Sequence, residues 1–109
     1  MSRKTRVTAS SGNVFKDLGL PNPEELLAKA ELVRQISNVI EQRGLTQVEA
    51  AEVLGTTQPK VSDLLRGRLS GFSMERLIRY LNALNRDVQI VVRRTPRGRK
   101  HGNVSVIAA

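Results

Sequence analysis

Apolar residues recur every three or four positions through residues 22–43, which is the spacing of one buried face of an α-helix. At the front, Asn22 is a favourable N-cap, Pro23 suits the first helical position, and Glu25 would complete a capping box. The pair Arg43-Gly44 supplies the cation and the left-handed residue with which helices commonly end. The pattern predicts a helix of about 20 residues. Its apolar positions are Leu26, Ala30, Val33, Ile36 and Ile40, with Leu32 and Val39 beside them.

Three shorter helices are predicted after this one, over residues 45–54, 57–66 and 73–85. Each begins beside a Thr or Ser whose side chain can accept a hydrogen bond from a first-turn amide. The first two are followed by a glycine, which tolerates the left-handed conformation of a helix end. The capping residues are Thr46, Thr57 and Ser73, and the glycines are Gly55 and Gly67.

The sequence after the last helix has a different pattern. Residues 87–92 read Asp-Val-Gln-Ile-Val-Val, and such a β-branched run predicts a strand. Residues 95–98, which contain Pro and Gly, would break it, and residues 104–107 read as a second strand or as a frayed end. An isolated β-branched edge invites aggregation, so we expect residues 87–92 to pair. The partner would be a second copy of the chain across a two-fold axis, or residues 104–107 in a hairpin.

The second and third predicted helices are separated only by Gly55-Thr56-Thr57, which is the spacing of a helix-turn-helix. A steep crossing in so short a turn needs a small residue where the helices touch and a residue that tolerates positive φ. It also needs apolar residues of the second helix that face the first. The residues with these properties are Ala51, Gly55, Val61 and Leu64.

Charge is unevenly distributed along the 109 residues, whose net charge is +8. Residues 16–87 are neutral in sum, with an acidic first half up to residue 52 and a basic second half. The whole positive excess therefore lies at the two ends of the chain. Such an excess favours anionic partners such as nucleic acid, although basic tails can also serve only to keep a protein in solution. The end residues are Arg3, Lys4 and Arg6, followed by Arg93, Arg94, Arg97, Arg99 and Lys100.

The composition gives little support for catalysis, metal binding or a cofactor. The chain has no cysteine and a single histidine, His101, so neither a zinc-thiolate site nor a His-based dyad is expected. No apolar run approaches the roughly 18 residues of a membrane span, and the basic start lacks the apolar run of a secretory signal. Only Phe15, Phe72 and Tyr80 could stack on bases, which makes RNA a less favoured partner than double-stranded DNA. We therefore expect a cytoplasmic protein that is not an enzyme.

Residues 45–67 resemble the Xre type of helix-turn-helix, which phage repressors, Cro proteins and many antitoxins share. The likeness extends over residues 14–94. Residues 13–20, the long helix, residues 70–73 and residues 85–92 are similar to HigA-like antitoxins, which act beside HigB/RelE-like toxins. The resemblance implies an all-α, lambda-repressor-like bundle of four to five helices, here with a short C-terminal β-strand.

The chain then divides into three parts. Residues 1–21 would be a flexible basic N-terminal arm, residues 22–86 the helix-turn-helix domain, and residues 87–109 a C-terminal strand with a basic tail.

The major groove of DNA admits one helix, whose first turn approaches base edges while the preceding helix rests on the backbone. In residues 57–66 this turn carries Gln58, whose amide can pair bidentately with adenine N6 and N7, and Xre repressors use a glutamine at this point. The resemblance implies that Gln47 binds a phosphate and buttresses Gln58, and helix N-termini favour anions. Pro59 departs from repressors with a second glutamine or a serine there, which leaves the base specificity open.

The other candidates lie along the same helix and in the loop that follows it. Lys60 can reach guanine or a phosphate, and Asp63 could accept from cytosine N4 or repel a wrong phosphate register. Arg66 and Arg68 suit phosphate clamping. Each of these side chains could instead be an ordinary surface residue. The predicted DNA-binding residues are Gln47, Thr57, Gln58, Lys60, Ser62, Asp63, Arg66 and Arg68.

One module of this size contacts a single half-site, so we expect a homodimer on an operator. Its interface would be residues 87–92 or, as a second choice, the apolar side of the fourth helix. If the antitoxin likeness holds, the chain represses its own operon and binds a basic HigB/RelE-like ribonuclease toxin through residues 14–20 and the acidic long helix. The alternative is an adaptor that neutralises a partner through the long helix 23–43 without reading DNA. The acidic residues of that helix are Glu24, Glu25, Glu31 and Glu41.

Overall fold

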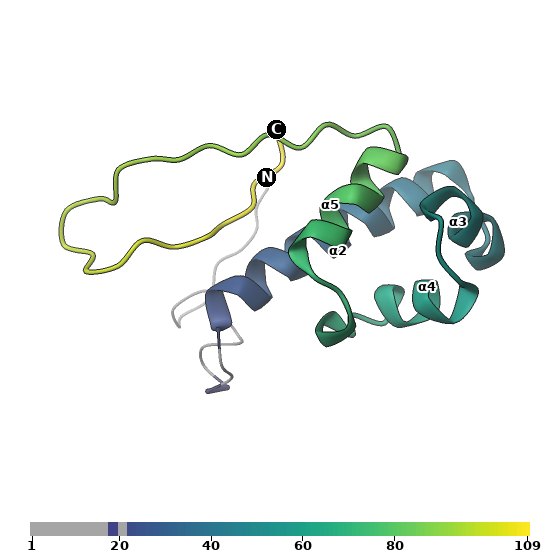
Figure 1. Cartoon of the computed structure of the whole chain (residues 1–109), viewed down its shortest axis with the longest axis horizontal. Coiled ribbons are helices and arrows are strands. Elements are labelled where there is room, and N and C mark those ends of the chain that lie inside the picture. The colour runs from purple at the N-terminus through teal and green to yellow at the C-terminus, as the bar shows by residue number, and fades with distance from the viewer. Residues whose placement is uncertain (1–17, 20–21) are drawn as a thin grey trace.

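The structure, a computed structural model, describes residues 18–19 and 22–109 of the chain. These residues form four α-helices and one 3-10 helix. In Figure 1, α2 crosses the helical body, α3 and α4 form an angled pair at one end of it, and α5 lies over α2. The elements are α2 (Pro23–Arg43), α3 (Gln47–Leu54), α4 (Gln58–Leu65), η1 (Leu69–Gly71) and α5 (Met74–Ala83).

The helices stand where apolar spacing and caps predict them. The expected bundle of four to five helices has four α-helices in the described residues, because η1 is only one short 3-10 turn. The predicted arm over residues 1–21 and the apolar stretch 14–20 lie outside the described residues, apart from Leu18 and Gly19.

The start of α2 differs from its prediction. Asn22 occupies the N-cap position in a left-handed conformation (φ 51°, ψ 53°), and its side chain makes no capping hydrogen bond. A capping side chain reaches the first-turn amides from an extended N-cap residue, and left-handed Asn22 does not have that conformation. The capping box expected with Glu25 is therefore wrong. The Glu25 carboxylate instead lies 3.7 Å from the ammonium of Lys29, one turn further along.

The caps of the shorter helices form as predicted. At the front of α3, the Glu49 N–H donates to the Thr46 hydroxyl (3.1 Å), and the Thr46 N–H donates to the Glu49 carboxylate (2.8 Å). This reciprocal pair is a complete capping box. At the front of α5, the Ser73 hydroxyl accepts from the Arg76 N–H at 3.1 Å. These helix starts therefore depend on contacts within a single turn.

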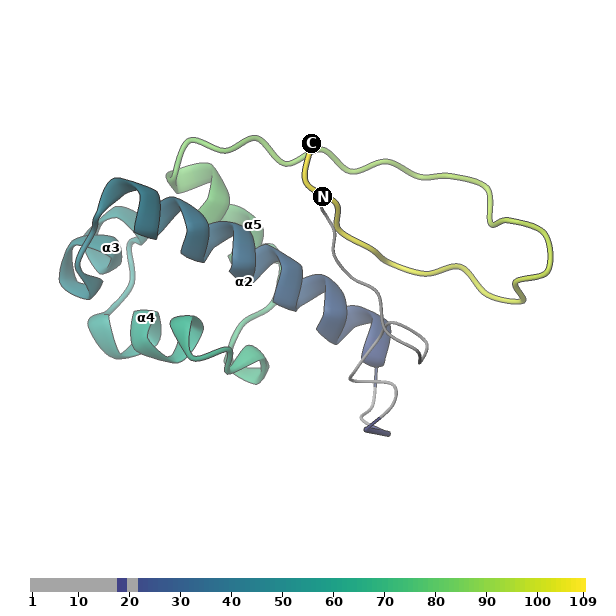
Figure 2. The same ribbon diagram turned by 180° about the vertical axis from the view of Figure 1, so that it is seen from behind.

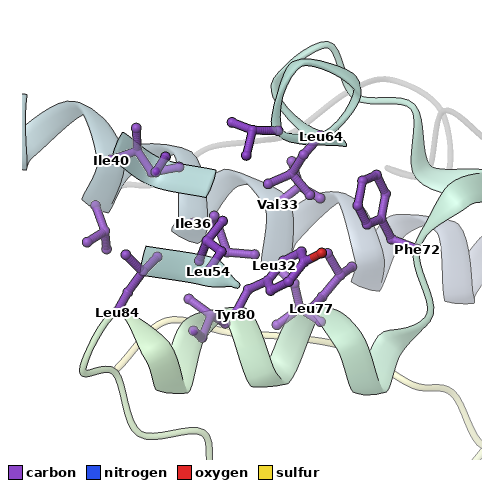
Figure 3. Packing of buried hydrophobic residues seen from close by; sticks show 14 of the residues in the cluster. Leu32, Val33, Ile36, Ile40, Leu54, Leu64, Phe72, Leu77, Tyr80 and Leu84 are labelled. Carbon is purple, nitrogen blue, oxygen red and sulfur yellow. The ribbon is translucent and has the colours of Figure 1, made fainter. Parts of the chain in front are cut away.

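One apolar core lies between the helices (Figure 3). Ile36 of α2, Leu64 of α4 and Leu77 of α5 are at most 1% exposed, so three helices contribute fully buried side chains. Phe72, after η1, meets Tyr80 of α5 edge-on with ring centroids 6.2 Å apart. The Tyr80 hydroxyl is buried and has no hydrogen-bond partner among the described residues. The core holds α4 against α3 and α2, and the side of α4 that carries Gln58 and Lys60 stays exposed.

A long side chain links the end of α2 to the end of α5. Arg43 donates from Nη2 to the Leu84 carbonyl, 2.6 Å away. Asn85 then turns the chain with a φ of 64°, and the Arg86 N–H returns to the Leu81 carbonyl at 2.9 Å. These bonds end α5 and fix the point at which the chain leaves the helical body.

Residues 87–109, here called the tail, leave that body as an extended loop. The loop runs away from α3 and α4, reverses and returns, as Figures 1 and 2 show. Within the tail the only backbone hydrogen bond joins the Arg99 N–H to the Pro96 carbonyl (3.4 Å), and no residue is in a β-strand. The predicted strand over 87–92 and its hairpin with 104–107 are therefore wrong for the single chain. A strand requires backbone partners, and these extended segments find none among the described residues.

The described part of the chain has two further properties that bear on partners. None of its helices is long and apolar enough to cross a bilayer. No group of three or more His, Asp or Glu side chains in the same residues comes together as a metal site.

Candidate nucleic-acid interface

The turn between α3 and α4 has the geometry that its sequence indicates. Val61 and Leu64 of α4 are 1% exposed, and Ala51 of α3 is 6% exposed where the two helices meet. Gly55 ends α3 with a φ of 72°, a conformation that residues with a Cβ rarely adopt. Apart from Gly55 and its neighbours along the chain, no atom lies within 4 Å of the position that a Cβ would take at Gly55. Glycine is therefore required there by backbone conformation and not by lack of space.

The front of α4 presents Gln58 to solvent. Its side-chain Nε2 donates a hydrogen bond to Oε1 of Gln47, the first residue of α3. Gln58 is exposed and Gln47 half-buried, so the pair lies at the surface. The contact orients the Gln58 amide and leaves its Oε1 and second N–H for a ligand. The two glutamines that were predicted to act together are thus in contact.

Lys60 is exposed in the first turn of α4 but has a defined orientation. Its ammonium lies 5.6 Å from the centroid of the Phe72 ring, within the range of a cation–π interaction. Phe72 is only 3% exposed, so its ring has a fixed position in the core. Lys60 is therefore held toward the loop between α4 and α5. Sequence reasoning missed this role of Phe72, and its only signal was an aromatic residue in a loop of small and polar residues.

Asp63 has a partner within the chain. Its Oδ1 lies 3.5 Å from Nη1 of Arg68, and the Arg68 N–H donates to the Asp63 carbonyl at 3.0 Å. The Arg68 side chain is still 63% exposed, so the guanidinium can meet an anion while the carboxylate holds it. Arg66, at the end of α4, is exposed as well. The loop after α4 therefore carries two accessible cations.

Thr57 and Ser62 are partly used by the fold itself. The Thr57 hydroxyl accepts from the Lys60 N–H at 3.4 Å and caps α4. Ser62 is half-buried and lies one turn behind Gln58 on the same side of the helix. The candidate residues on α4 thus extend from its cap to its last turn.

The basic residues of the tail lie elsewhere. Figures 1 and 2 show the reversal of the tail at the opposite end of the molecule from α3 and α4, and the longest extent of the molecule is 46 Å. The chain does not bring these residues together with Gln58. The basic tail residues are Arg93, Arg94, Arg97, Arg99 and Lys100, all of them exposed.

Comparisons with known proteins agree with this geometry. The model of a helix-turn-helix domain family matches residues 14–93, most of the chain. A solved structure assigned to the XRE family of transcriptional regulators is 47% identical in sequence and superposes with a TM-score of 0.75. The match covers 82% of this chain and 100% of that one. No curated protein matches the chain.

Proposed function

This chain belongs to the family of helix-turn-helix domains, and we propose that it is a sequence-specific, DNA-binding transcriptional repressor that acts in the cytoplasm at the nucleoid. The observation that carries the proposal is the exposed Gln58 at the front of α4, oriented by Gln47 at the front of α3. A helix in the major groove meets base edges with its first turn, and a glutamine there can pair with N6 and N7 of adenine. In this proposal α4 is the reading helix.

The side chains around Gln58 would set the register of α4 on the duplex. Backbone amides at the fronts of α3 and α4 favour a phosphate, because the helix dipole places partial positive charge there. Lys60 supplies a cation beside the first turn, and Arg66 and Arg68 supply two more at the other end of α4. Asp63 acts as a positioning residue for Arg68 through their 3.5 Å contact. Phosphate contacts of this kind fix orientation, whereas Gln58 reads the sequence.

The substitution Gln58→Ala tests the reading role in a mobility-shift titration on the DNA upstream of the chain's own coding sequence. Loss of a bidentate contact with adenine is expected to raise the Kd about 10- to 100-fold. Gln42→Ala is the matched control, because Gln42 is exposed on α2, and its Kd should stay within about twofold of the wild type. The proposal fails if the wild-type chain shifts this DNA no better than an unrelated duplex at the same salt concentration.

We propose that the repressor binds as a homodimer. One α4 reads one half-site, and affinities useful in a genome usually require two. A footprint on the upstream DNA should then show two protected half-sites separated by about one helical turn or a multiple of it. A single protected half-site at saturation would contradict the dimer.

The resemblance to HigA-like proteins supports a further role as the autoregulating antitoxin of a HigB/RelE-like toxin. On α2, Leu27 is 41% exposed, and Glu24 and Glu31 lie one turn away on either side of it. An apolar residue between carboxylates suits a basic ribonuclease. Glu31 also binds Arg34 at 2.9 Å, so part of the negative charge of this face is already balanced. The alternative function, an adaptor that neutralises a partner through α2 without sequence-specific DNA binding, would use the same face.

Two variants separate these functions when the chain is co-expressed with the product of the adjacent open reading frame. Leu27→Lys places a cation against a basic partner, so it should abolish rescue of growth and leave the mobility shift intact. Gln58→Ala should weaken the mobility shift and leave the rescue of growth intact. Rescue of growth by a wild-type chain that does not regulate the promoter would favour the adaptor, and an adjacent product that does not arrest growth would contradict the antitoxin role.

A further inference from the structure

We propose that a second copy of this chain completes the tail, with the extended arms of each tail pairing with those of the other copy in an intermolecular β-sheet. The outgoing arm is residues 87–92 and the returning arm is residues 102–109. The inference deepens the homodimer of the proposed function by naming its surface. It does not depend on recognition of DNA.

Among the described residues, neither arm has a backbone partner, which leaves both open to pairing. The one backbone hydrogen bond within residues 87–109 belongs to the reversal between the arms, from Arg99 to Pro96. The arms themselves are extended, and neither donates to nor accepts from the backbone of the other. Unpaired extended segments of this kind are templates for strand addition by another chain.

The side chains of the arms continue the apolar core beyond the helical body. Val88 of the outgoing arm and Val106 of the returning arm pack against that core. Side chains alternate along an extended chain, so Ile90 and Val92 belong to the face of Val88, and Val104 belongs to the face of Val106. Ile90 is 78% exposed, Val92 92% and Val104 57%. This face starts on the core but is open to solvent where it leaves the body.

The distribution of charge in the tail favours a second copy as the partner. The outgoing arm has one charged residue, Asp87, and the returning arm has none. All five basic residues of the tail lie in the connecting segment 93–100. Arms from two copies can therefore pair without bringing cations together. A charged partner, acidic or basic, would find little complementary charge on the arms.

The number of strands points the same way. Two arms from one chain could form at most a two-stranded ribbon, which is marginal in water, and here they do not pair at all. Two copies contribute four arms, enough for a sheet with a stable apolar face. A two-fold axis also presents the same surface of each copy to the other, which is the usual arrangement in homodimers.

Sedimentation of the full chain without DNA, over a series of concentrations, tests the inference. The wild type should be a dimer, and Val92→Asn should raise the dimer Kd at least about tenfold, because each dimer loses two apolar cross-strand contacts. The helical circular dichroism should not change. Val48→Asn is the matched control: Val48 is 61% exposed on α3, and its loss should leave the dimer intact.

A cross-linking experiment tests the same interface without a measurement of the dimer Kd. Because the chain has no cysteine, Ile90→Cys can form a disulfide only with another copy. We expect covalent dimers from Ile90→Cys under oxidising conditions and none from Val48→Cys.

Three results would overturn the inference. These are a wild type that is monomeric at every concentration, a dimer that Val92→Asn leaves unchanged, and arms whose amides become protected from hydrogen exchange only when the adjacent gene product is added. Each concerns assembly without DNA, so the Gln58→Ala titration remains a separate test of the proposed function.

Discussion

The helical body, residues 22–86, buries most of its large apolar side chains, whereas the tail, residues 87–109, leaves most of its own exposed. In the body, Leu77 is completely buried, and the helices cover one another's apolar faces. In the tail, Val92 is 92% exposed, although a valine is as apolar there as in the core. A helix satisfies its backbone within its own segment, whereas an extended segment needs another strand. The body therefore satisfies its own backbone, whereas the arms of the tail have no backbone partner among the described residues.

The largest difference between the two regions is expected for apolar truncation. Leu77→Ala leaves a cavity in the core and should lower the free energy of unfolding by about 2–5 kcal/mol. Ile90→Ala should change it by less than about 0.5 kcal/mol, because Ile90 is 78% exposed in the single chain. Urea unfolding at a dilution where the chain sediments as a monomer measures both. Similar losses for the two variants would mean that the tail is packed in the monomer.

A smaller difference is expected for two glycines with left-handed backbone. Gly55 has a φ of 72° and Gly98 a φ of 88°, and at both the position that a Cβ would take has no atom within 4 Å other than those of the glycine and its neighbours along the chain. Gly55→Ala should cost about 1–2 kcal/mol, because α3 and α4 hold the turn in a conformation that alanine disfavours. Gly98→Ala should cost less than about 0.5 kcal/mol, since the tail can relax around it. Thermal unfolding of both variants tests this, and equal costs would show that the tail reversal is as constrained as the helix-turn-helix.

The smallest effect is expected at a helix cap. Thr46→Ala removes the side chain that accepts from the Glu49 N–H and should destabilise the body by about 1 kcal/mol. Thr95→Ala, in the exposed tail, is the counterpart and should have no measurable effect. Chemical denaturation with a common baseline resolves the two. A loss from Thr95→Ala equal to that from Thr46→Ala would place a cap-like contact in the tail of the free chain.

The parts of the fold that sequence alone predicts depend on neighbours a few positions apart. Thr46 and Glu49 lie within one turn, so their capping box follows directly from the residue types. Asn22 was also a suitable cap by residue type, but its backbone is left-handed instead of extended, and its side chain makes no capping hydrogen bond. The residues 87–92 have the composition of a strand, but composition does not supply a partner. Local signals therefore predicted all four helices, but they did not predict the backbone conformation of Asn22 or the lack of a partner for residues 87–92.

In the candidate site, too, the contacts that could be predicted from the sequence are those between residues that short turns bring together. The contact between Gln47 and Gln58 could be predicted from the sequence, because a short turn brings the fronts of two consecutive helices together. The contact of Asp63 with Arg68 crosses the end of α4 and was not foreseen, although both residues were already candidates. The position of Lys60 over a buried aromatic ring depends on the core, and sequence spacing gives no sign of it.

The hydrogen bond from Arg43 to the Leu84 carbonyl acts at the root of the tail. It joins the last turn of α5 to the end of α2 and so restrains the direction in which the tail leaves the helical body. In a pair of molecules joined by their tails, this anchorage would set how far apart, and at what angle, the two reading helices stand. The tolerated spacing of the target DNA would then depend in part on the guanidinium of Arg43.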